Sequence, residues 1–202
     1  MMKRFILCLP FILTILTACK EEETPYPAII SVFANVETNA TGTLWRFITD
    51  KRQVFQFSNP QAGYRPDTTY RAVCGYVPEG EYAWVYQLEG ALLLKDSTAN
   101  TRHDPIDILS AWRTTDYVNM HLSPRTQGGR QFWGFCIDSL KPGHCFLSLH
   151  HNQGHDAVSY NQSLYASIHL NDIAGLQKSD TISWDVTTFK GTKRWTLPPT
   201  IE

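Results

Sequence analysis

The sequence predicts an all-β protein, with a small β-barrel followed by a β-sandwich. Many short segments either alternate apolar and polar residues or are rich in β-branched and aromatic residues, as strands are. Turn-forming pairs such as Asn59-Pro60, Pro142-Gly143 and Gln153-Gly154 separate these segments. No long segment has the 3.6-residue period of an amphipathic helix, and the best helical candidate is the short stretch 171–175.

Strands are expected wherever these patterns occur. They lie at residues 28–36, 43–49, 53–58, 70–76, 82–94, 108–114, 117–122, 132–139, 143–150, 164–170 and 181–188. About five strands in the first half suit a Greek-key barrel of the OB type, which is a five-stranded fold. The strands of the second half suit a sandwich of two sheets.

A domain boundary is expected in the polar stretch 96–104. This stretch contains few apolar residues that could contribute to a core. We therefore place an OB-like barrel at 28–98 and a sandwich at 104–197.

The first eighteen residues are expected to be a lipoprotein signal peptide. Lys3 and Arg4 precede an apolar run of about 12 residues, which is shorter than the roughly 20 residues that a membrane-spanning helix needs. The run ends in Leu16-Thr17-Ala18-Cys19, which resembles a bacterial lipobox. Cys19 would then carry acyl chains such as palmitate, and several chains on one residue anchor a protein firmly. The alternative is an ordinary secretory cleavage site beside a chance cysteine.

Residues 19–27 are expected to form an acidic tether. The charged stretch Lys20-Glu21-Glu22-Glu23 resembles the surface-export signal of Bacteroides-type lipoproteins. We therefore expect a protein held on the outer membrane by Cys19 and facing the exterior. A solvated charged linker without an export role is the alternative.

The charge balance argues against nucleic acid as a partner. Without Lys3 and Arg4, 16 basic residues remain against 19 acidic ones, and they form no basic run. Phosphate binding depends on clustered Lys and Arg. We expect a monomer whose ligand is a protein, a peptide or a glycan, and no cofactor.

Two cysteines of one predicted hairpin are candidates for a disulfide. A turn centred between Leu140 and Lys141 would place Cys136 opposite Cys145, and opposed residues of an antiparallel pair can reach bonding distance. The alternative is that both are small buried side chains.

One polar cluster stands out in the second half. It consists of His150, His151, Asn152, His155 and Asp156. Zinc binds such residue types, but adjacent strand residues such as His150 and His151 point to opposite faces. We therefore expect no metal, and interpret the cluster as a polar hairpin whose side chains bond to the backbone.

A set of ordered motifs resembles the NigD-like lipoproteins of Bacteroides-type bacteria. The motifs are Asp104-Pro105-Ile106, Trp112, Asp116-Tyr117-Val118-Asn119, His150-His151-Asn152, Tyr160 and Tyr165-Ala166-Ser167. The resemblance implies an OB-like barrel followed by a β-sandwich. It also implies a bacteriocin-immunity role, because one member is encoded beside bacteriocin genes, but it carries over no catalytic residues.

We interpret the residues of the first three motifs as structural, not functional. Asp104 would begin a turn, Asp116 and Asn119 would bond to backbone at strand ends beside Tyr117, and a buried Trp112 would organise the sandwich core. No catalytic motif is found. The sequence thus favours a non-enzymatic, membrane-anchored binding protein. A small envelope hydrolase or a glycan-binding accessory protein is the alternative.

Overall fold

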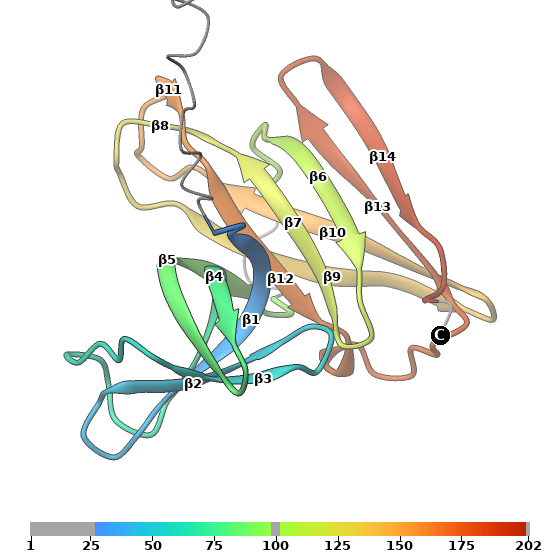
Figure 1. Cartoon of the computed structure of the whole chain (residues 1–202). Coiled ribbons are helices and arrows are strands. Elements are labelled where there is room, and N and C mark those ends of the chain that lie inside the picture. The colour runs from blue at the N-terminus through green and yellow to red at the C-terminus, as the bar shows by residue number, and fades with distance from the viewer. Residues whose placement is uncertain (1–26, 98–101, 201–202) are drawn as a thin grey trace, which may run out of the picture.

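The structure is a computed structural model that describes residues 27–97 and 102–200, and it is built almost entirely of strands (Figure 1). The elements are β1 (Ile30–Thr38), β2 (Leu44–Thr49), β3 (Val54–Phe57), β4 (Thr69–Glu79), β5 (Tyr82–Leu94), β6 (Asp107–Arg113), β7 (Tyr117–Ser123), β8 (Arg125–Thr126), β9 (Phe132–Lys141), β10 (His144–Asn152), β11 (Tyr160–Asn161), β12 (Leu164–His169), the 3-10 helix η2 (Leu170–Asp172), β13 (Thr181–Thr188) and β14 (Gly191–Leu197). The predicted all-β class is confirmed.

The first five strands curl into the N-terminal barrel. Their order is β3-β2-β1-β4-β5, and β3 also pairs in parallel with β5, which brings the ends of the row together. Alternate residues of these strands point inward, so Phe47, Tyr76 and Val36 form a buried aromatic and aliphatic core. This arrangement is compatible with the OB-like barrel expected from the sequence.

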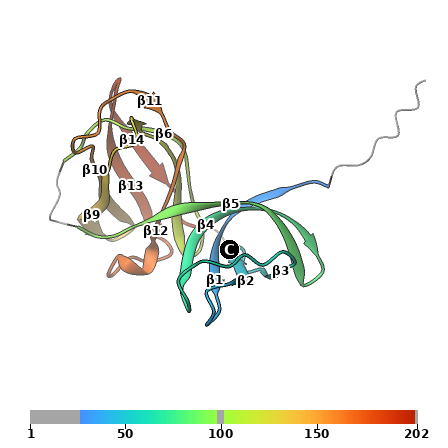
Figure 2. The same cartoon turned by 90° about the vertical axis from the view of Figure 1, so that its left-hand side faces the viewer.

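Strand β5 belongs to both halves of the molecule. Its first part pairs with β4, whereas its last residues, Ala91 to Leu94, pair in parallel with β12. One continuous sheet, β3-β2-β1-β4-β5-β12-β7-β6, therefore runs from the barrel into the sandwich, and Figure 2 shows β5 crossing between them. The polar boundary segment expected at 96–104 follows this strand, and residues 98–101 lie outside the described residues.

The sandwich packs the far end of this sheet against a second one. The second sheet has the order β14-β13-β10-β9, and the core between the two sheets includes Met120, Phe135 and Trp184. The sequence did not predict β14, because most of its residues are exposed and several are charged or polar. The expected helix at 171–175 is reduced to η2, a single 3-10 turn.

Trp112 lies outside the sandwich core, which corrects the expectation from the sequence. Its exposed fraction is 37%. The register of β6 against β7 shifts between Ile108 and Ser110, so an extra residue changes the phase of the alternation. Ala111 then turns toward the core opposite Met120, and Trp112 turns away from it. The buried tryptophan of the core is Trp184, at 4% exposure.

The expected disulfide is also wrong. The β9–β10 hairpin turns at Pro142-Gly143, where Gly143 has a φ of 82°, and pairs His144 with Lys141. Cys145 therefore lies opposite Leu140 and Cys136 opposite Ser148. Both are free thiols.

The lipobox, the tether and Cys19 lie outside the described residues. Within the two described ranges, the structure contains no helix that is both long and apolar enough to cross a membrane.

Candidate functional site

The two domains meet at a buried arginine. Arg71 of β4 is 6% exposed, and its guanidinium forms an ion pair with Asp50 at 2.7 Å. It also donates hydrogen bonds to Asn119 Oδ1 at 2.8 Å and to Ser167 Oγ at 3.1 Å. Asn119 and Ser167 are both fully buried and belong to β7 and β12 of the sandwich. Buried polar and charged side chains from both domains are therefore hydrogen-bonded to one another at the junction.

Further contacts complete this junction network. Asn119 Nδ2 donates to Asp50 Oδ2 at 2.7 Å, and Ser167 Oγ donates to Asn119 Oδ1 at 2.7 Å. The guanidinium of Arg71 lies 3.8 Å from the ring centroid of Tyr117, whose hydroxyl contacts Asn35. A fully bonded buried network fixes the relative position of the elements that it joins.

The network gives the Asp-Tyr-Val-Asn motif a role that the sequence did not reveal. Asn119 bonds to side chains of the barrel, and Asp116 pairs with Arg52 of the barrel at 2.7 Å. Both residues were expected to bond to backbone at strand ends. The one signal for the network was Arg71 itself, a charged residue inside the apolar segment 70–76.

An aromatic pocket lies at the same junction. Its volume is about 190 Å³, and both domains contribute to its wall. The lining residues are Ser31, Val32, Phe33, Val73, Ser110, Trp112, His121 and Tyr165. The rings contact one another, because Phe33 meets Trp112 and Tyr165 edge to face with centroids 5.2 and 5.6 Å apart. This junction pocket can hold an apolar or aromatic group against ring faces, with hydroxyl and imidazole groups at its wall.

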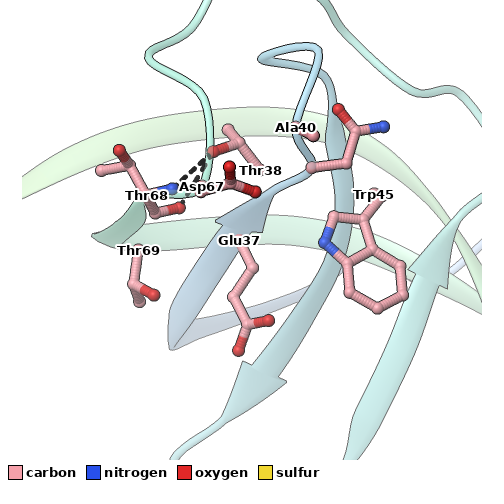
Figure 3. A pocket seen from close by; sticks show the side chains of 8 residues that line it. Glu37, Thr38, Ala40, Trp45, Asp67, Thr68 and Thr69 are labelled. Atoms are coloured by element: carbon pink, nitrogen blue, oxygen red, sulfur yellow. Dashed lines mark hydrogen bonds between the residues drawn. The ribbon is translucent and has the colours of Figure 1, made fainter.

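A second pocket lies at the far end of the barrel (Figure 3). It is larger, about 420 Å³, and is lined by Trp45, Glu37, Thr38 and neighbouring loop residues. Several of its polar side chains are already engaged within the barrel. Glu37 accepts a 2.6 Å bond from Arg46, whose guanidinium also lies 4.5 Å from the Trp45 ring, and Thr38 donates to two loop carbonyls. This barrel-end pocket is the weaker candidate for a ligand.

The polar cluster of the sandwich holds loops in place. His151 is 1% exposed, is stacked on Trp133 at 4.1 Å, and bonds to Asp104 O and to Gln131 Oε1. His150 lies against His103 instead, on the opposite side of the strand. Burial lowers the pKa of His151, and the bond to the Asp104 carbonyl opposes this shift.

The remaining members of that cluster lie at its edge. Asn152 Oδ1 accepts a bond from Gly154 N, and His155 is exposed. Among residues 27–97 and 102–200, no three His, Cys, Asp or Glu side chains group closely enough to hold a metal ion.

Three cysteines remain in the described part of the chain, and two of them are buried. Burial raises the pKa of the Cys74 thiol to about 12 and that of Cys145 to about 11. Since the thiolate is the nucleophile, neither cysteine is activated at neutral pH.

Asp156 is the anchor of the loop between β8 and β9. Its carboxylate accepts bonds from the Thr126 hydroxyl, from the backbone N–H groups of Gln127 and Gly129, and from Gln131 Nε2. A Cβ on Gly129 would lie 2.8 Å from the carboxylate, so glycine permits this close approach. These bonds lower the pKa of Asp156 from 3.8 to about 2.

The depressed pKa predicts an acid-sensitive loop. The contribution of Asp156 to stability should be fully present above pH 3.8 and be lost as the pH falls toward about 2, because protonation removes an acceptor. Urea unfolding followed by tryptophan fluorescence between pH 5 and pH 2 should show this loss. The Asp156→Asn variant should be less stable at pH 5 and less dependent on pH; an unchanged pH dependence would contradict the assignment.

Comparisons with known proteins agree with this architecture. A NigD-like immunity protein from Bacteroides caccae superposes with a TM-score of 0.67 at 20% identity, covering 87% of this chain and 99% of that one. A protein of Parabacteroides distasonis provisionally named as toxin-related gives 0.67 at 16%, covering 84% and 92%. A provisionally named lipoprotein from Bacteroides fragilis gives 0.64 at 10%, covering 86% and 99%. At these identities the likeness shows the fold.

The sequence itself establishes the family. No curated protein matches the chain significantly. The family model described as the NigD-like C-terminal beta sandwich domain matches residues 91–198, which is more than half of the chain and begins where β5 enters the sandwich. The chain therefore belongs to the NigD-like family.

Proposed function

We propose that the protein is a non-catalytic lipoprotein of the cell envelope that binds a partner in an immunity-like role. The observation that carries this proposal is the junction pocket, in which Trp112 of the sandwich and Phe33 of the barrel form one aromatic wall. Large aromatic side chains in concave sites are typical anchors of protein and peptide binding. The likeness to a NigD-like immunity protein supports the same role.

The junction network favours binding by a preorganised pocket. Since Arg71 and Asn119 hold the two domains together, the two sides of the pocket are positioned before a partner arrives. A preformed site avoids the entropic cost of ordering its walls on binding. Anchoring through Cys19, on the outer membrane and facing the exterior, would present this pocket to molecules that approach the cell.

The proposed role predicts protection of cells in a pocket-dependent manner. Bacteria that express the full chain should survive secreted peptide bacteriocins that inhibit the same cells without it. Trp112→Ala should abolish most of this protection, because it removes the aromatic wall that Trp112 contributes. Cys19→Ala should abolish it by releasing the protein from the membrane fraction. The measurement is growth inhibition, beside immunoblots of membrane fractions.

Trp45→Ala is the matched control. Trp45 is 38% exposed, close to the 37% of Trp112, but it lies at the barrel-end pocket. Full protection by Trp112→Ala, at equal protein levels, would exclude the junction pocket as the site. If the wild-type chain protects cells against none of the bacteriocins tested, the immunity-like role is contradicted.

A further inference from the structure

Strand β5 carries a row of exposed aromatic side chains. Tyr82, Trp84 and Tyr86 are 48%, 43% and 55% exposed, whereas Ala83 and Val85 between them are buried in the barrel core. The rings of Trp84 and Tyr86 have centroids 6.4 Å apart. Exposed apolar groups that gather in one patch mark interaction sites, whereas scattered ones do not.

This aromatic row is continuous with the junction pocket. Val77 of β4 lies opposite Trp84, and Gly75 lies opposite Ser31, which lines the pocket. Residues opposite each other in a sheet share a face. The side chains of Gln87 and Ile29 cover the bare backbone of Gly75, since a Cβ there would lie 3.2 Å from Gln87 Cβ and 3.5 Å from Ile29 Cγ2, and Ile29 is itself 56% exposed. A mostly apolar path, which Gln87 flanks at Gly75, therefore leads from the pocket to Trp84.

The charges on this hairpin are all negative. Residues 72–94 contain three carboxylates, Glu79, Glu81 and Glu89, and no Lys, Arg or His. Glu79 lies opposite Tyr82, and Glu89 lies opposite Val73 of the pocket wall. The ion pairs between described residues involve none of these three glutamates. Their charges therefore add to a negative field over the aromatic row.

We propose that this aromatic–acidic face binds a cationic, amphipathic peptide. Exposed ring faces attract both apolar side chains and Lys or Arg cations. Carboxylates around them complement the positive charge and speed the encounter. An anionic membrane surface would be repelled by the same glutamates, and a neutral glycan would gain nothing from their charge. The inference rests on the proposed function, because it names the chemistry of the partner that this protein would bind.

The test uses a short dye-labelled peptide of alternating lysine and leucine. The full chain is held in phosphatidylcholine nanodiscs, with empty nanodiscs as the blank, and binding is followed by fluorescence anisotropy. The peptide should bind the protein and should bind more weakly as salt is added, because salt screens exposed charges. A peptide with glutamate in place of lysine should not bind.

Two variants separate the contributions of the rings and the charges. Trp84→Ala, and the triple variant Glu79→Gln, Glu81→Gln, Glu89→Gln, should each weaken peptide binding by at least about tenfold. The matched controls are Phe132→Ala, an exposed aromatic residue of β9 in the sandwich, and Asp67→Asn, an exposed residue just before β4 begins, and they should leave binding unchanged. Unchanged binding in either hairpin variant would overturn the proposal.

Other outcomes would also overturn it. If the glutamate peptide binds as tightly as the lysine peptide, charge complementarity has no role in binding. Binding of a neutral oligosaccharide such as cellohexaose, lost in Trp84→Ala and retained in the triple variant, would assign the face to a glycan. The two proposals can fail separately: if Trp112→Ala still abolishes protection of cells while the lysine peptide does not bind, only the proposed chemistry of the partner falls.

Discussion

Replacing Arg71 with alanine should lower the free energy of unfolding by about 3–5 kcal/mol, the usual cost of removing one partner from a buried ion pair. Asp50, with a side chain only 12% exposed, would lose its positive partner, and Asn119 and Ser167 would lose a donor at the domain junction. Urea unfolding followed by tryptophan fluorescence measures this loss.

The exposed ion pair between Arg52 and Asp116 provides the control. The side chain of Arg52 is 68% exposed, so Arg52→Ala should cost no more than about 1 kcal/mol, as surface pairs do. If Arg71→Ala costs no more than Arg52→Ala, the junction network does not stabilise the fold. A double variant, Arg71→Met with Asp50→Leu, should recover part of the loss, because it leaves no unpaired charge.

Trp184→Ala should have an effect of similar size for a different reason. Trp184 is buried between the sheets of the sandwich and is stacked on Trp195 with centroids 6.3 Å apart. Truncating a buried tryptophan removes its transfer free energy and leaves a cavity, which together cost about 3–5 kcal/mol.

Trp112→Ala is the informative comparison for this core. Its ring contacts Phe33 but keeps 37% of its surface exposed, so its truncation removes less buried surface and leaves no enclosed cavity, and it should cost less than Trp184→Ala, for which about 3–5 kcal/mol is expected. Thermal unfolding of the two variants ranks them directly. If Trp112→Ala lowers the stability more than Trp184→Ala does, Trp112 and not Trp184 is the main core tryptophan, and the described orientation of Trp112 on β6 is contradicted.

The sequence predicted where the strands lie, but not which residues of each strand point toward the core. Alternation within 108–114 places Ile108 and Trp112 on one face, and only the bulge after Ile108 separates them. A bulge leaves no mark in hydrophobic alternation, because it inserts a single residue. The hairpin of Cys136 and Cys145 failed similarly, since moving the turn to Pro142-Gly143 changed every opposing pair.

The junction could be predicted only in part. Tyr117 and Asn119 stood out as motif residues, but their partners Arg71 and Asp50 come from a distant segment, which local patterns cannot identify. The junction pocket was missed for the same reason, because two domains supply its walls. Arg71 in an apolar strand was the one local sign, since a buried charge requires partners from elsewhere in the fold.

The sharing of β5 between the domains also constrains the order of folding. The barrel can close once β5 has been synthesised. The residues Ala91 to Leu94 at the end of β5 cannot pair until β12, which comes much later in the chain, is available. Non-local parallel pairing of this kind is slow. Until then an apolar strand end, Ala91-Leu92-Leu93-Leu94, is an open edge on which two chains could pair. Lys95 and Asp96 directly follow it, and charges in that position discourage aggregation while the sandwich assembles.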